Sequence, residues 1–192
     1  MASKFFDVST LPIELDNKAA LKAAYHLDLE KISGYLKNES VFITCEREII
    51  NNLVELIEDN IRSMLNRKSD STQFFICDGV LGGPNNLEGI PRMVEQFMEF
   101  SDTRDSGIIV IPFFDLLTTT TNSSLTDLTK NIQYKLSRKL YLSGKEVRYL
   151  AFCSPEFSIP ESLRQLFDRQ MKLGGVDRSV IHRLVTQDEA RR

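Results

Sequence analysis

The chain has 192 residues, which is room for one domain, and a formal net charge of −3. Hydrophobic residues make up 42 % of it and charged residues 27 %, which excludes a disordered or fibrous chain. The slightly acidic balance gives no support for a broad nucleic-acid-binding surface, and no apolar run approaches the roughly 20 residues that cross a bilayer. Three cysteines, each in an apolar run, are typical of reduced thiols. We expect a globular cytoplasmic protein with no nucleic-acid partner and no membrane span.

Short apolar runs alternate with amphipathic stretches along the whole sequence. Apolar runs of this length predict buried strands, and apolar residues at helical spacing predict helices. In chain order, the predicted elements are helix 17–37, strand 40–45, helix 46–66, strand 73–77, a helix that Pro91 begins, strand 107–111, helix 124–139, strand 147–153, short helix 161–167, strand 169–173 and helix 177–185.

This alternation predicts the fold class. Strands that are apolar almost throughout, each followed by a helix, form a mainly parallel sheet covered on both faces. With right-handed crossovers the result is a three-layer α/β sandwich with roughly five strands. We expect a single domain, in which an N-terminal arm and helix (residues 1–39) pack on an α/β core (residues 40–192).

The familiar catalytic and phosphate-binding patterns are missing. The loop after the first predicted strand lacks the glycines of a phosphate loop, and no GxxxxGK[ST] or GxSxG occurs. Cys45 and Arg47 are too close for a tyrosine-phosphatase loop, and His26 and His182 have no metal-ligand spacing. The sequence therefore predicts no catalytic residue, no metal site and no cofactor.

A glycine-rich loop after the second predicted strand is the one candidate ligand loop. The stretch around Asp78 resembles the hhhDxDGxL motif of haloacid-dehalogenase phosphatases, but the position of the nucleophilic Asp is occupied by Ile76. Gly79, Gly82 and Gly83 either supply turn conformations closed to other residues or, with Asp78, form a small anion or partner site.

The last third of the chain resembles the AAA+ family of P-loop ATPases. Leu163–Gln170, followed by Gly174 and Asp177–Arg178, is similar to the family segment whose arginines reach the nucleotide of a neighbouring subunit. Residues 149–162 resemble the fourth strand and its loop, and residues 108–111 occupy the place of the third strand. The resemblance implies a P-loop-NTPase-like topology and puts Arg169 at the second family arginine. Arg164 and Arg178 are further candidate interface arginines.

The same comparison shows departures where nucleotide chemistry needs particular residues. The family's magnesium-binding Asp-Glu pair falls on Pro112 and Phe113, and Asp115 three positions further on is no obvious replacement. The sequence ends where the family continues into a helical lid, so the expectation is either a piece of a longer protein or a core that stands alone. The sensor Asn falls on Ser154, and the first arginine falls on Leu166. Without these groups phosphoryl transfer loses its electrostatic stabilisation. The resemblance therefore implies a degenerate AAA+ domain, a pseudo-ATPase.

The leading hypothesis is a non-catalytic AAA+-like domain that scaffolds or regulates a larger assembly, such as an ATPase assembly, through a protein partner or homo-oligomerisation. One alternative is a small-molecule or phosphate-binding enzyme that uses the loop at Asp78. A third is a doubly wound domain of no assigned family, in which Leu163–Arg169 is an ordinary amphipathic helix end. A fourth is a structural subunit that docks a partner through its sheet edge or an exposed apolar helix face, with the N-terminal arm as a candidate.

Overall fold

Five short segments of the chain form one parallel sheet in the order β2-β3-β4-β1-β5. The structure is a computed structural model, and it describes residues 21, 22, 24–65, 72–78, 89–118, 130, 131, 134, 135, 138 and 146–173. The strands are β1 (Val41–Thr44), β2 (Phe74–Ile76), β3 (Gly107–Ile111), β4 (Val147–Cys153) and β5 (Arg169–Lys172). Each of them lies within a predicted strand, so the predicted number and places of the strands are confirmed.

The central strands are buried because their sequences are apolar on both faces. All five residues of β3 are buried, and in β4 only Arg148 is partly exposed. Parallel strands covered by helices on both faces need such continuous apolar runs. β5 is different, because it lies at the edge of the sheet and its polar residues are mostly exposed.

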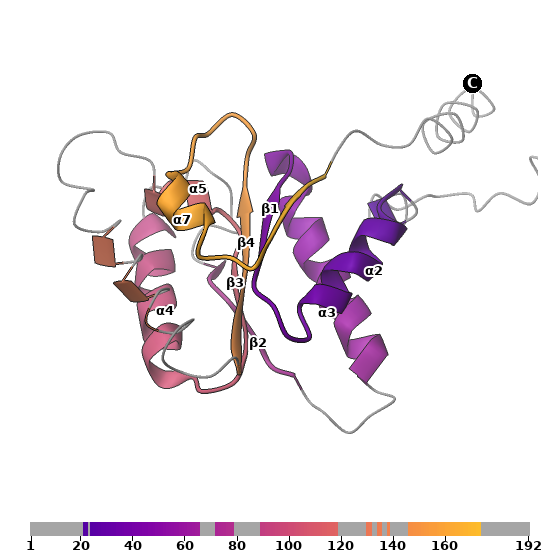
Figure 1. The fold of residues 1–192 in the computed structure, drawn as a ribbon, viewed down its shortest axis with the longest axis horizontal. Helices are drawn as coiled ribbons and strands as arrows, with labels where there is room; N and C mark the ends of the chain where they lie inside the picture. The colour runs from indigo at the N-terminus through magenta and orange to yellow at the C-terminus, as the bar shows by residue number, and fades with distance from the viewer. Residues whose placement is uncertain are drawn as a thin grey trace, which may run out of the picture.

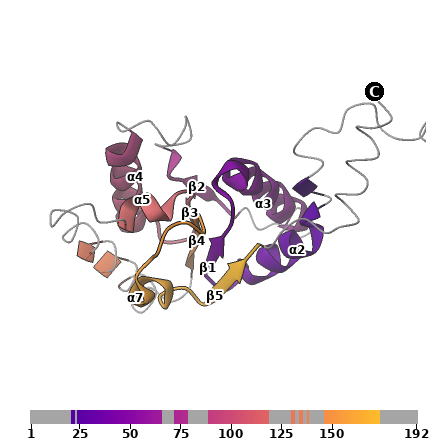
Figure 2. The same ribbon diagram turned by 90° about the horizontal axis from the view of Figure 1, so that it is seen from above.

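Helices cover both faces of the sheet (Figures 1 and 2). On one face lie α2 (His26–Tyr35) and α3 (Ile50–Leu65), which follows the short 3-10 helix η2 (Arg47–Ile49). On the other face lie α4 (Gly89–Thr103), α5 (Phe114–Thr118) and α7 (Glu161–Arg164). The predicted three-layer α/β sandwich is confirmed.

The predicted helices differ from the observed ones mainly at their ends. The helix expected from residue 46 begins as the 3-10 turn η2, and the short helix expected over 161–167 ends at Arg164. The helix expected over 177–185, the N-terminal arm and most of the helix expected over 124–139 lie outside the described residues. The division of the chain between residues 39 and 40 stays a prediction.

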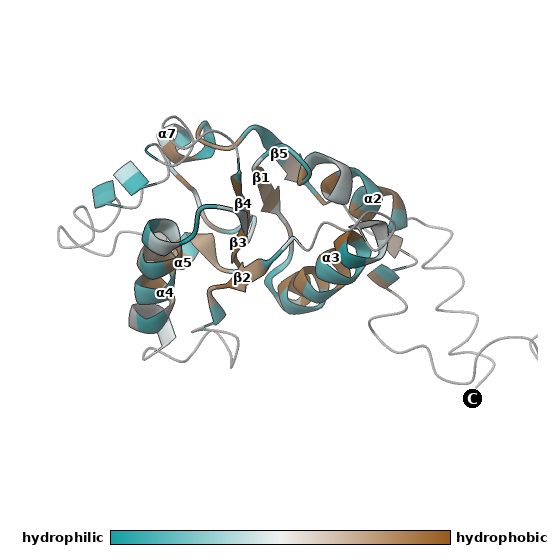
Figure 3. Ribbon diagram, turned by 90° about the horizontal axis from the view of Figure 1, so that it is seen from below, coloured by the Kyte–Doolittle hydropathy of each residue, from teal (hydrophilic) through white to brown (hydrophobic). Residues whose placement is uncertain are grey.

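Aromatic side chains join the sheet to the α5 and α7 side of the core. The ring centroid of Phe42, on β1, lies 6.0 Å from that of Phe114 and 5.4 Å from that of Phe167, and those two are 5.7 Å apart. Edge-to-face and tilted pairs at such distances add to the free energy of area burial. Figure 3 shows hydrophobic colour along the central strands and mixed colour along α3 and α4, as expected of helices with one buried face.

One backbone position at the start of β3 requires glycine. Gly107 has φ of +115°, and a Cβ there would lie 2.8 Å from the carbonyl oxygen of Gln73 and 2.9 Å from the ring of Phe75. Gly34, inside α2, has no atom within 4 Å of the corresponding position. Of these two glycines, Gly107 is therefore the one expected to resist a larger side chain.

We predict that Gly107→Ala lowers the free energy of unfolding by about 1–3 kcal/mol, because it combines backbone strain with a steric clash. Gly34→Ala is the matched control and is expected to raise stability by about 0.5–1 kcal/mol through helix propensity. Urea denaturation of both variants measures this difference. Equal effects of the two substitutions would contradict the assigned conformation of Gly107.

Candidate functional site

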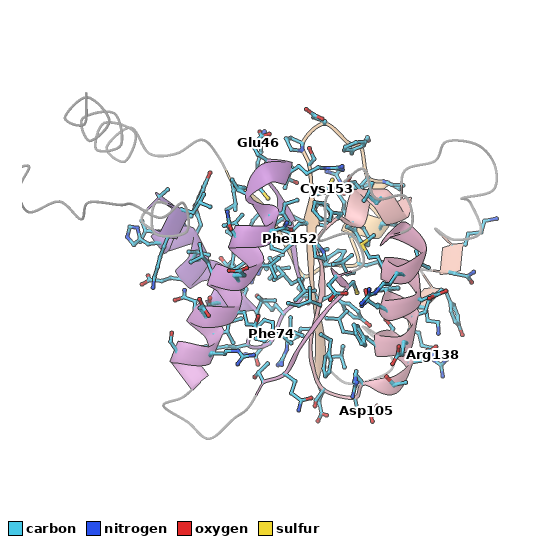
Figure 4. All side chains as sticks on the ribbon, turned by 180° about the vertical axis from the view of Figure 1, so that it is seen from behind. Glu46, Phe74, Asp105, Arg138, Phe152 and Cys153 are labelled. Atoms are coloured by element: carbon cyan, nitrogen blue, oxygen red, sulfur yellow. The ribbon has the colours of Figure 1, made fainter. Side chains whose placement is uncertain are left out.

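The carboxyl edge of the sheet is the first place to look for a site. In open α/β sheets, ligands bind beyond the carboxyl ends of the strands, where successive connections leave for opposite faces. Here the chain after β1 continues into α3 on one face, and the chain after β4 leads to α7 on the other. Figure 4 shows Glu46 and Cys153 together at this edge and Asp105 at the opposite one. The position where the connections change from one face of the sheet to the other, called the switch point, therefore lies between β1 and β4.

A buried ion pair occupies this edge. Arg47, in the turn after β1, donates a hydrogen bond from Nη2 to Oδ2 of Asp115, in the first turn of α5. The Asp115 side chain is 0 % exposed and the Arg47 side chain 20 %. The guanidinium carbon also lies 5.5 Å from the ring centroid of Phe113 and 4.9 Å from that of Phe157. Arg47 thus links three loops that are distant in the sequence.

Burial and the neighbouring polar groups shift the pKa of Asp115 in opposite directions. Burial raises the pKa of Asp115 above the ordinary carboxyl value, while the Arg47 guanidinium and the backbone N–H groups of Asp115 and Ser154 lower it. Because burial is the larger effect, the ionised carboxylate depends on the nearby guanidinium. The role of Arg47 is therefore to neutralise a charge that the core would otherwise disfavour.

Sequence reasoning did not find this pair. It considered Arg47 only as part of a phosphatase loop and passed over Asp115 because three positions separate it from the family's acid position. The turn after β3, which runs through Pro112 and Phe113 into α5, brings Asp115 back to the sheet edge. An acid inside the otherwise apolar run 107–117 was the available signal.

The connection from β1 to α3 is very short. Only Cys45 and Glu46 stand between the last residue of β1 and the start of η2, which leads directly into α3. The backbone N–H of Cys45 donates to the carbonyl of Cys153, 3.0 Å away, so the turn is bound to the end of β4. No glycine lies between Thr44 and Ile50.

The three cysteines are buried and free, as the sequence predicts. Burial raises the pKa of Cys45, Cys77 and Cys153 to about 12 each. Because the thiolate is the reactive form, these thiols are poor nucleophiles near neutral pH.

The candidate ligand loop is described only at its first residue. Asp78 Oδ1 accepts a hydrogen bond of 2.6 Å from Nε2 of Gln96 and lies 3.7 Å from Nη2 of Arg92, both on α4. Its side chain is 47 % exposed. Gly79, Gly82 and Gly83 lie outside the described residues. The described contacts therefore join the Asp78 carboxylate to α4 of the same domain.

The candidate interface arginines lie on different faces of the sheet. Arg169 donates from Nε and Nη2 to the two carboxylate oxygens of Glu39, both 3.0 Å away, and lies 5.1 Å from the ring centroid of Tyr35 on α2. Arg164, on α7, donates to Glu161. Arg178 lies outside the described residues. The structure therefore does not bring Arg164 and Arg169 together at one surface.

Comparison with known proteins shows the fold but no family. No family model matches the chain, and no curated protein matches it. Solved structures do match, among them the Orc1 protein of Aeropyrum pernix in complex with DNA, with a TM-score of 0.50 and 11 % sequence identity. The match covers 93 % of this chain and 51 % of the other, so the chain spans about half the length of that protein. The likeness confirms an α/β fold of the AAA+-like, P-loop-NTPase type.

The same match corrects the expectation about nucleic acid. We expected no nucleic-acid partner because the net charge is −3. One solved structure with this fold is a complex with DNA, so that exclusion was wrong. Net charge averages over the whole surface, whereas phosphate contacts depend on local cations.

No helix in the described part of the chain is long and apolar enough to span a bilayer.

The Arg47–Asp115 pair gives a prediction for stability. Arg47→Ala leaves a carboxylate buried without its cation, so we expect the free energy of unfolding to fall by about 3–5 kcal/mol at neutral pH. Arg62→Ala is the matched control, because Arg62 is 66 % exposed in its pair with Glu58, and it should change stability by no more than about 0.5 kcal/mol.

The deficit of the Arg47→Ala variant should depend on pH. A folded-state carboxyl pKa above the unfolded value means that stability is lost as pH rises between the two values. Removal of Arg47 raises the pKa of Asp115 further. The deficit relative to the wild type should therefore shrink as pH is lowered from about 7 to about 5. Urea denaturation at both pH values measures this change, and an unchanged deficit would contradict the assigned coupling.

Proposed function

We propose that this chain is a nucleotide-independent AAA+-like domain that acts by contact within an assembly on DNA, in the cytoplasm. The Arg47–Asp115 pair is the observation that carries the proposal, because it occupies the sheet edge at which such folds bind ligands. The three reduced, buried thiols suit a reducing compartment.

The local geometry argues against a nucleotide at this edge. Phosphates bind where a glycine-rich loop turns several backbone N–H groups toward them at a helix N-terminus. Here the strand passes into η2 after two residues, and Glu46 brings negative charge to the turn. Phosphate oxygens would meet like charge and too few donors.

A magnesium ion would also lack its ligand. The carboxylate at the end of β3 is that of Asp115, which is enclosed and paired with Arg47. A divalent cation would have to displace the guanidinium from a site closed by Phe113 and Phe157. Phosphoryl transfer depends on such an ion to neutralise developing charge, so the edge is suited to a structural role.

The assembly part of the proposal is supported by the fold likeness to an Orc1 protein in complex with DNA. Arg169 is the best-placed candidate contact, since its side chain is 51 % exposed. A partner's carboxylate or phosphate has to compete with Glu39 for its two donors. The alternative of an enzyme using the loop at Asp78 has less support, because Arg92 and Gln96 already engage that carboxylate.

Isothermal titration with ATP and ADP, each with and without Mg²⁺, tests nucleotide independence. We expect no saturable heat with any of the four titrants. A dissociation constant below about 1 mM that requires Mg²⁺ would overturn the proposal.

Fluorescence anisotropy with a labelled DNA duplex tests the contact with DNA. We expect binding that weakens steeply as salt rises, because phosphate contacts release counterions. Arg169→Ala should weaken it, whereas Arg62→Ala, at an exposed position of α3, should not. Absence of binding at low salt up to about 100 μM protein would contradict a direct contact with DNA.

A further inference from the structure

A cavity of about 550 Å³ opens at the carboxyl ends of β1, β4 and β5. It shares the Phe157 ring with the Arg47–Asp115 pair but extends away from that pair toward β5. Its volume lies in the range of small-molecule sites. The residues that line the cavity therefore decide which class of small molecule it can bind.

One part of the lining is apolar. Phe42, Cys153 and Ile159 form buried surface, each with at most 5 % exposure. Phe157 stands at the side toward solvent with 36 % of its surface exposed. This part of the cavity suits an aromatic or branched apolar group.

Two cations line the polar part. Lys172 pairs with Thr44 in the β1–β5 register, so both side chains leave the same face of the sheet and reach the cavity. Within the described part of the chain, Lys172 has no ion pair. Arg164 donates there only from Nη2, to Glu161, so its Nη1 makes no hydrogen bond among the described residues. Both cations have hydrogen-bond donors available for a ligand.

The local charge balance favours a ligand of low charge. Arg164 and Lys172 stand against Glu156, which also lines the cavity, and Glu161, which pairs with Arg164, so these four side chains are neutral together. A carboxylate adds one negative charge to this neutral surface and a dianionic phosphate adds two, so the carboxylate is the less costly ligand. We propose that this cavity binds a carboxylate joined to an apolar group, with Arg164 and Lys172 holding the carboxylate and Phe42 and Ile159 contacting the apolar part.

Such a carboxylate has two sources, a free organic acid and the C-terminus of a peptide. The site is separate from the question of nucleotide binding, because none of its argument uses the Arg47–Asp115 pair. An experiment can therefore contradict the carboxylate site without contradicting the proposed nucleotide independence, and the reverse also holds.

Isothermal titration of the full chain with hydrocinnamate and with a short peptide ending in phenylalanine tests the site. We expect at least one probe to bind with a dissociation constant of about 1 mM or lower. The probe that binds more tightly identifies the source. Hydrocinnamamide and the peptide amide, which lack the negative charge, should bind at least about tenfold more weakly. Equal binding of acid and amide, or no binding of either acid, would overturn the proposal.

Arg164→Gln and Lys172→Gln should each weaken binding of the acid by about tenfold. Arg62→Gln is the matched control, because Arg62 is on α3 and 66 % exposed, and it should leave the affinity unchanged. Thermal unfolding of each variant checks that the fold is intact. Equal weakening by the control, or unchanged binding in both cavity variants, would also overturn the assignment.

Discussion

The ion pair between Arg47 and Asp115 is the constraint on which the carboxyl edge of the sheet depends. The two residues are 68 positions apart, and their contact fixes the turn after β1 against the start of α5. Taking a carboxylate out of water costs several kcal/mol, and this cost is offset only by a close cation and further hydrogen bonds. Both are present at Asp115. The edge is therefore held in one arrangement, and Phe113 and Phe157 shield the guanidinium that maintains it.

This arrangement separates two chemically different regions. The switch point between β1 and β4, where folds of this type bind ligands, is taken by the protein's own guanidinium. The cavity toward β5 keeps unused donors on Arg164 and Lys172. On the opposite face, the contact between Arg169 and Glu39 joins β5 to the end of α2. The same short strand thus contributes to the cavity from one face and to the helix layer from the other.

Parts of the candidate site could be predicted from the sequence, and parts could not. The absence of glycines after Thr44 is visible in the sequence, and it anticipates the short turn into η2. Asp115 was passed over because its position was compared with a motif by counting residues, whereas the turn after β3 decides where its carboxylate lies. Arg164 and Arg169 were grouped through the family's arginine segment, although Arg164 lies on α7, on one face of the sheet, and the Arg169 side chain lies against Tyr35 of α2 on the other.

By itself the sequence determined the fold class, because apolar runs of strand length and amphipathic helices can be buried together only in a layered parallel sheet. It also determined that the thiols are core residues, because each lies in an apolar run. The tertiary structure decided which residues lie side by side. Arg47 and Asp115, Thr44 and Lys172, and Glu39 and Arg169 are distant along the chain. The physical reason is that strand order brings distant residues to one edge, and periodicity carries no information about strand order.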